Sequence, residues 1–193
     1  MKIIKTPVLY LILLLFPMIS FGQDRWSVEF RPGLNFATQD LGNIDIAVGF
    51  GFEGTAAYRF MPHLSGYVGL GWNQFQEEDS FTSTNVDFEE TGYTLGLQFI
   101  YPLAEPSLSY LVRVGVVYNH IEVENNDENS IADTGYGFGW QLGIGIEMRL
   151  DDKWSLRPEL RFRSVARNLE TESVSIDLDL NYIAIGLGIS RTF

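Results

Sequence analysis

Nine charged residues stand at alternate positions among glycines and apolar residues, and they are the side chains of this sequence best placed to do chemistry. The nine are Glu29, Arg31, Glu53, Arg113, Glu147, Arg157, Glu159, Arg161 and Arg163. A carboxylate pair such as Glu147 and Glu159 could act as general acid and base if one member kept its proton at neutral pH. The surrounding arginines favour the ionised form of both carboxylates instead. We therefore interpret the nine charges as a structural ion network, with no catalytic residue and no enzymatic activity.

Two further motifs could bind a cofactor or a metal. Gly49 to Gly54 matches the GxGxxG pattern of dinucleotide sites, but it lies inside an alternating strand pattern rather than between a strand and a helix. The acid-rich segment 122–133 offers oxygen ligands, but an EF-hand-like loop starting at Asn125 would have Ser130 where the tight turn needs glycine. We predict no cofactor and no resident metal, and we interpret the acidic segment as a solvated loop. Loose association of that segment with Ca²⁺ or Mg²⁺ remains an open alternative.

The stretch from Gly135 to Arg163 shows how the chain can position its charges. Large apolar residues occupy every second position up to Leu150, and small or charged residues fill the positions between them. Alternate side chains of a strand point to opposite faces, so one face is apolar and the other is small or charged. A turn at 151–153 then pairs each long charged side chain with an opposite charge or with a small or polar residue. The expected pairs are Glu147 with Arg157, Gly145 with Glu159, Gly143 with Arg161, and Gln141 with Arg163.

The same alternation predicts eight strands, joined by three short turns and four longer, acid-rich segments. Their expected ranges are Trp26–Ala37, Ile44–Phe60, Leu64–Phe75, Thr91–Tyr101, Ser107–His120, Gly135–Leu150, Trp154–Arg163 and Asn181–Phe193. In the resulting register Glu53 faces Gly71, and Arg113 is expected to face Gly96. The pattern indicates an all-β fold, an antiparallel up-and-down transmembrane barrel that is apolar outside and polar inside. An eight-stranded barrel has an interior just wide enough for side chains to fill.

Composition and the N-terminal segment fit an exported protein with a single domain. The 193 residues carry a net charge of −12, which argues against a nucleic-acid partner, and no cysteine, which excludes disulfides and thiolate metal sites. Two lysines precede the apolar run 8–19, and Ser-Phe-Gly follows it at 20–22, an order typical of a cleaved secretory signal. We predict a signal peptide at residues 1–22 and one barrel domain at residues 23–193.

The signal, the two-residue repeat and the last strand together carry a family resemblance. The apolar faces end in aromatic residues at both ends, as at membrane interfaces, and the final strand alternates up to a terminal Phe193. Residues 26–193 resemble the small eight-stranded outer-membrane barrels of the OmpA/OmpX type. The resemblance implies an integral protein of the outer membrane of a Gram-negative bacterium, a monomer in contact with outer-membrane lipid and lipopolysaccharide. It also implies that Phe193 is a signal for the barrel-insertion machinery.

The expected function is that of a membrane scaffold with a side-chain-filled lumen, whose loops serve envelope integrity, adhesion or ligand contact. The main alternative is a narrow porin for small solutes. A soluble lipocalin-like carrier is disfavoured, because an interior of glycine and arginine leaves no apolar cavity for a ligand. Some small barrels are lipid-modifying enzymes with an outward-facing histidine and serine at the membrane rim. His120 lies at the corresponding end of its strand, but Glu122 rather than serine stands two residues further on.

Overall fold

The computed structural model describes residues 24–38, 47–76, 86–125, 130–171 and 174–193, so the predicted signal peptide lies outside the described residues. No helix in these ranges is long and apolar enough to cross a membrane. The strands are β1 (Trp26–Ala37), β2 (Gly49–Met61), β3 (Leu64–Gln76), β4 (Val86–Pro102), β5 (Leu108–Asn125), β6 (Ser130–Asp133), β7 (Gly137–Arg149), β8 (Trp154–Thr171) and β9 (Val174–Thr192).

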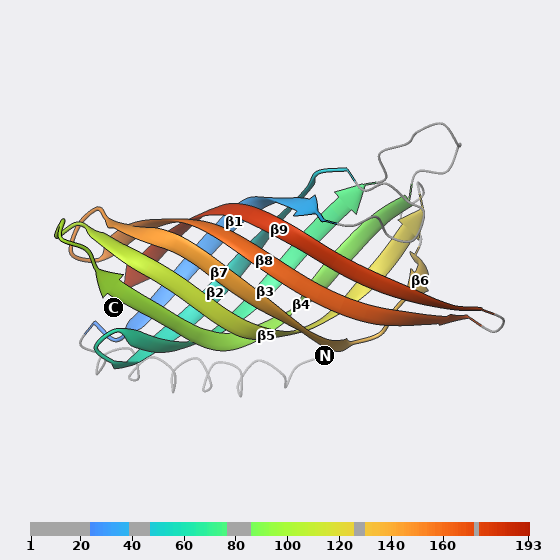
Figure 1. Ribbon diagram of the computed structural model, residues 1–193, viewed down its shortest axis with the longest axis horizontal. Helices are drawn as coiled ribbons and strands as arrows, with labels where there is room; N and C mark the ends of the chain where they lie inside the picture. The colour runs from blue at the N-terminus through green and yellow to red at the C-terminus, as the bar shows by residue number, and fades with distance from the viewer. Residues whose placement is uncertain (1–23, 39–46, 77–85, 126–129, 172–173) are drawn as a thin grey trace, which may run out of the picture.

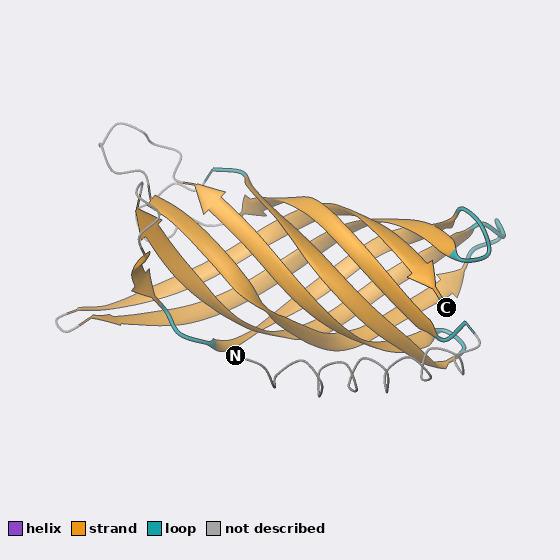
Figure 2. Ribbon diagram, turned by 180° about the vertical axis from the view of Figure 1, so that it is seen from behind, coloured by secondary structure: helices purple, strands orange, loops and turns teal. Residues whose placement is uncertain are grey.

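The strands close into one antiparallel barrel (Figure 1). Each long strand pairs with its neighbours along the chain, and β1 pairs with β9 to close the sheet. The short β6 pairs with the end of β5, while β7 pairs with the rest of β5, so eight strands form the wall. Figure 2 shows that the β2–β3, β4–β5 and β7–β8 connections share one end with the C-terminus, here named the turn end, and that the opposite end is the loop end. The predicted eight-stranded up-and-down barrel is confirmed.

The two faces of the wall are inverted relative to a soluble protein. Outward-facing side chains are large and apolar; Leu95 is 65% exposed and Phe138 is 73% exposed. Inward-facing side chains of the same strands are mostly polar and buried, as shown by Gln141, which is 1% exposed between the exposed Trp140 and Leu142. An apolar exterior around a polar interior is the arrangement expected when lipid surrounds the barrel.

The predicted register is confirmed for three pairs of the β7–β8 hairpin and for one pair elsewhere. Gly143 lies opposite Arg161, Gly145 opposite Glu159, Gln141 opposite Arg163, and Glu53 opposite Gly71.

The predicted neighbour of Arg113 is wrong by two residues. Arg113 lies opposite Gln98, and Gly96 lies opposite Gly115. β4 ends at Pro102 and β5 begins at Leu108, and the Leu103 N–H donates to the Leu108 carbonyl at 2.9 Å, so the turn lies one residue later in the chain than expected. A shift of two residues keeps every side chain on its face, and the alternation therefore cannot distinguish the two registers.

The strands extend further towards the loop end than the sequence pattern predicts. β4 begins at Val86 rather than Thr91, and β5 ends at Asn125 rather than His120. Residues 164–180, which lie between the last two predicted strands, belong mostly to β8 and β9, which form the hairpin that reaches farthest in Figure 1. Beyond the membrane both faces of a strand can be polar, so alternation fades while the backbone ladder continues. At the start of β2, residues 44–46 of the predicted strand lie outside the described residues.

Candidate functional site: the charged lumen

Five glutamates and five arginines face one another inside the barrel. Eight of the nine predicted charges are buried, and Glu147 is the exception, with a side chain that is 13% exposed. The tenth charge is Glu90, which the sequence pattern assigns to a loop. The ten are Glu29, Glu53, Glu90, Glu147, Glu159, Arg31, Arg113, Arg157, Arg161 and Arg163. Equal numbers of each sign leave this set of charges formally neutral.

Glu29 is the centre of the layer nearest the turn end. Arg113 donates to both oxygens of this carboxylate, at 3.1 Å from Nη1 to Oε1 and 2.5 Å from Nη2 to Oε2. Arg157 donates from Nη1 to Glu29 Oε2 at 2.7 Å and from Nη2 to Glu147 Oε2 at 2.5 Å. These contacts connect β1, β5, β7 and β8 through the middle of the lumen.

Glu53 and Glu159 form the middle layer with two arginines. Arg31 donates from Nη1 to Glu159 Oε2 at 2.7 Å and from Nη2 to Glu53 Oε1 at 3.2 Å. Arg161 donates from Nε to Glu159 Oε1 at 3.1 Å and from Nη1 to Glu53 Oε2. Each buried carboxylate is therefore compensated by more than one guanidinium, which is what a buried charge requires.

Glu90 accepts four hydrogen bonds in the layer nearest the loop end. Its Oε1 accepts from Arg163 Nη1 at 3.0 Å and Asn119 Nδ2 at 2.5 Å. Its Oε2 accepts from the Tyr182 hydroxyl at 2.6 Å and Asn73 Nδ2 at 3.2 Å. A signal for this role is present in the sequence, because Glu90 lies an even number of residues away from the inward-facing positions of β4.

An apolar cluster closes the lumen between Glu90 and the loop end. Its members are Phe75, Phe88, Ile121, Val165, Leu180 and Tyr182, with Ala184 packed against them. Phe75 and Tyr182 meet edge to face, with 5.2 Å between ring centroids. The sequence interpretation of a wholly polar interior is therefore wrong in this part of the barrel. A hollow lined in part by Arg31 and Tyr182 measures only about 20 Å³, which is room for a single water.

Glycines make space for the charges, as the sequence pattern predicts. A Cβ added to Gly188 would lie 2.6 Å from Glu29 Oε1, and one added to Gly186 would lie 2.9 Å from Arg31 Cγ. Strand β9 thus lacks side chains where two long side chains of the network, Glu29 and Arg31, cross it.

The remaining candidate motifs lie mostly on strands of the barrel wall. His120 Nδ1 lies 3.6 Å from Glu122 Oε1, and its ring lies on Tyr136 with 4.5 Å between centroids. The GxGxxG motif at 49–54 lies within β2, which continues as a strand to Met61. No group of three or more metal-binding side chains is assembled in the described ranges. Residues 126–129 of the acidic segment lie outside them.

Phe193, the predicted insertion signal, lies at the turn end beside the β1–β9 seam. Its backbone N–H donates to the Trp26 carbonyl at 2.8 Å, and the Arg191 guanidinium carbon lies 4.9 Å from the centroid of its ring. The terminal residue is thus joined to the first strand of the barrel.

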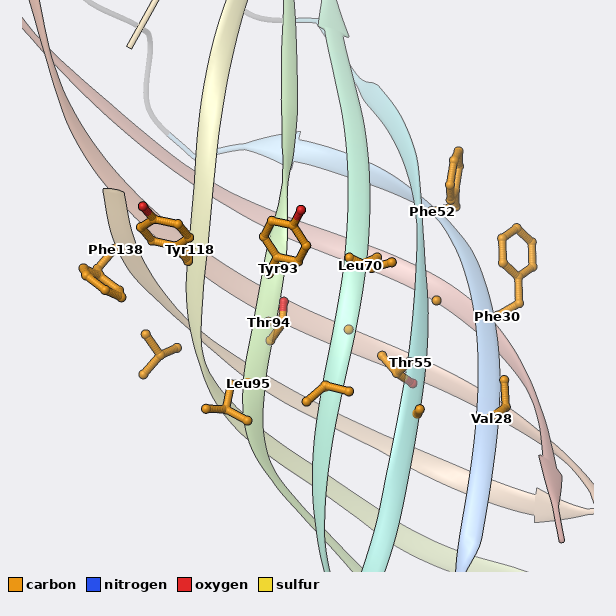
Figure 3. Close-up of a pocket in the computed structure, with 15 residues that line it drawn as sticks. Val28, Phe30, Phe52, Thr55, Leu70, Tyr93, Thr94, Leu95, Tyr118 and Phe138 are labelled. Carbon is orange, nitrogen blue, oxygen red and sulfur yellow. The ribbon is translucent and has the colours of Figure 1, made fainter. Parts of the chain in front are cut away.

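The outer wall carries a mainly apolar hollow of about 820 Å³ over β1 to β5 and the start of β7. It forms where β2 presents Gly54 and Ala56 between larger residues, and a Cβ added to Gly54 would meet no atom within 4 Å. Figure 3 shows the side chains around Leu70, with Phe30 and Phe52 on one side and Tyr93, Tyr118 and Phe138 on the other. The hollow opens on the apolar outer face of the barrel.

Comparison with known proteins places this geometry among bacterial barrels. The sequence profile of the outer membrane protein beta-barrel domain matches residues 10–193. No curated protein sequence matches the chain significantly. Neisserial surface protein A has a similar structure, with a TM-score of 0.65, 12% identity, and coverage of 87% of this chain and 97% of that one. OprG from Pseudomonas aeruginosa has a TM-score of 0.59 and 13% identity, and the match covers 89% of this chain and 98% of OprG. The outer membrane protein AlkL has a TM-score of 0.52 and 18% identity, and the match covers 90% of this chain and 92% of AlkL. At identities this low, the structural similarity shows a shared fold and nothing about a shared role.

Proposed function

Because this chain belongs to the family of outer membrane protein β-barrel domains, we propose that it is a scaffold with a closed lumen that presents its loop end at the cell surface. The chain is an integral protein of the outer membrane of a Gram-negative bacterium. Its loop end would then face the outside, in contact with lipopolysaccharide, and serve envelope integrity, adhesion or ligand contact.

The main support for the proposal is that two groups of side chains, one charged and one apolar, close the lumen. Ten charged side chains fill the section inside the membrane, and the apolar cluster of Phe75, Phe88, Ile121, Val165, Leu180 and Tyr182 fills the section towards the loop end. A solute would have to separate buried ion pairs and then pass a dry apolar constriction. Both steps oppose passive conduction, because an uncompensated buried charge and a wetted apolar core are each unfavourable.

Conductance in planar lipid bilayers tests the proposal against the narrow porin. The purified, folded protein should leave the bilayer electrically silent over a range of voltages. Reproducible single-channel steps, abolished when the protein is unfolded beforehand, would overturn the closed scaffold and support the porin.

We also propose that the protein is monomeric and has no enzymatic activity. His120 is the side chain whose position most resembles a catalytic group at the membrane rim, and Glu122, Tyr136 and the cross-strand Thr91 are among its neighbours. The purified protein should not transfer acyl groups between labelled phospholipid and lipopolysaccharide. Acyl transfer that His120→Ala abolishes would show that the barrel is an enzyme. A mass above that of one chain in detergent would contradict the monomer.

A further inference from the structure

The lumen opens at the turn end into a polar cavity of about 170 Å³. Its lining includes four arginines, Arg25, Arg59, Arg149 and Arg157, and two carboxylates, Asp24 and Glu147. Arg157 is committed to Glu147 and Glu29, at 2.5 and 2.7 Å. None of the ion pairs in the described part of the chain involves the other three arginines. The mouth of the barrel is therefore a concave surface with an excess of positive charge.

Two of these arginines are direct cross-strand neighbours on the inner face. The Arg59 N–H donates to the Arg25 carbonyl at 2.8 Å, at the end of the β1–β2 ladder. Like charges in this position destabilise an antiparallel pair. An anion held between the two guanidiniums would convert this repulsion into attraction.

The backbone fixes one of the two guanidiniums at the mouth. Asp24 has a φ of 51°, in the left-handed region that residues other than glycine seldom adopt. In this conformation its carbonyl accepts a hydrogen bond from Arg59 Nη2 at 2.6 Å. An uncommon backbone conformation beside a cavity, with an arginine attached to it, is the kind of pre-arranged feature found at binding sites.

We propose that this turn-end mouth, defined by Arg25, Arg59 and Arg149, binds a phosphate group, either free or on the headgroup of a lipid. The planar fork of a guanidinium matches two oxygens of a phosphate at once. A concave wall with an excess of positive charge concentrates the potential that attracts an anion. The cavity has the volume of roughly six waters at ~30 Å³ each, which accommodates one such group. Ser65, Gln98 and Ser109 line it with hydroxyl and amide groups. The site is independent of the proposed loop function.

The test uses the folded barrel in maltoside micelles free of phosphate, with amide NMR signals of Ser65, Gln98 and Ser109 as reporters. Inorganic phosphate and a short-chain phosphatidic acid are titrated separately into wild type, Arg59→Gln and Lys153→Gln. Lys153→Gln is the matched control, because it removes one positive charge from an exposed turn at the same end. Wild type and the control should show saturable shifts of these signals, and Arg59→Gln should bind at least tenfold more weakly.

The two titrants separate the two sources of the phosphate group. Saturation by both assigns the site to a free phosphate as well as a headgroup, and saturation by the lipid alone assigns it to a headgroup. The absence of saturable shifts with either titrant would overturn the proposal. Equal affinity in wild type and Arg59→Gln would do the same, because binding would then not depend on the mouth arginines.

Discussion

Arg113 and Glu29 form a two-point ion pair across the full width of the lumen, at 3.1 and 2.5 Å. Their strands, β5 and β1, are four places apart in either direction around the eight-stranded wall. The pair therefore joins opposite walls that share no backbone hydrogen bonds. It is desolvated as well, since the two side chains are 1% and 2% exposed.

Replacing Arg113 by Gln should strongly destabilise the barrel. The change leaves Glu29 as a buried carboxylate without its two-point partner, and breaking such a pair costs about 3–5 kcal/mol. Urea unfolding in lipid vesicles, followed by tryptophan fluorescence, measures the loss. Lys153→Gln in an exposed turn should change stability by less than about 0.5 kcal/mol. In the double variant with Glu29→Gln the two losses should be far from additive, and strict additivity would mean that the pair is not coupled.

Two glycines allow a matched test of the interior and the outer wall. A Cβ on Gly96 would lie 2.2 Å from the Val114 carbonyl oxygen and 2.7 Å from Tyr67 Cε1, whereas a Cβ on Gly54 would meet nothing within 4 Å. Gly96→Ala should destabilise the barrel by about 1–3 kcal/mol through overpacking. Gly54→Ala should be neutral or slightly stabilising. Similar losses in both variants would show that the inner and outer faces are wrongly assigned.

Strand positions, faces and most of the register could be predicted because the membrane forces a strict alternation. Inside lipid a misplaced residue of either kind is costly, so the pattern from Phe138 to Leu150 has a single consistent interpretation. The neighbour of Arg113 could not be predicted in the same way. Registers that differ by two residues give identical faces, and only the hydrogen bonds of the β4–β5 turn select between them.

The part of the lumen near the loop end could not be predicted, because the strands there have left the membrane. Glu90 reads as one more acid in an acidic segment unless β4 is known to begin at Val86. Phe88 and Leu180 likewise read as isolated apolar residues, and Phe75 as the last residue of its predicted strand. They become a cluster only when the extended strands carry them into the lumen. The local sequence shows which face of a strand each residue would occupy, but it does not show how far the strands extend.

The turn between β7 and β8 should give stability that depends on pH. Hydrogen bonds from the backbone N–H groups of Lys153 and Trp154, both 2.7 Å from Asp151 Oδ1, hold the pKa of the Asp151 carboxyl below its usual range. A depressed pKa stabilises the folded state above the unfolded pKa of about 3.9, and this contribution is lost as pH falls through the folded value. Asp151→Ala should therefore be less stable than wild type at pH 7, and the difference should shrink towards pH 3. A difference independent of pH would show that ionisation plays no part, and Asp152→Ala controls for the loss of a nearby charge.

Deletion of Phe193 should reduce insertion into the outer membrane more than it reduces the stability of barrels already inserted. The residue contributes a backbone hydrogen bond to Trp26 and lies beside Arg191, contacts that secure only the end of the β1–β9 seam. Electrophoresis in SDS without heating measures the folded fraction in membranes, since a closed barrel should change mobility only when boiled. Phe60→Leu, an outward-facing change at the same end, is the control. Normal insertion after the deletion would remove Phe193 as the insertion signal.

Opening either the ion network or the apolar cluster alone should leave the barrel non-conducting. Phe88→Ala shortens the apolar cluster but leaves the ion network intact, and Arg161→Ala opens the network but leaves the cluster dry. Each change should cost about 3–5 kcal/mol of stability, so the folded fraction must be checked by unheated electrophoresis before recording. Single-channel steps are expected only when both substitutions are combined. If Arg161→Ala alone conducted as much as the double variant, the ion network would be the only barrier, because water and ions would then be passing the apolar cluster in its native form.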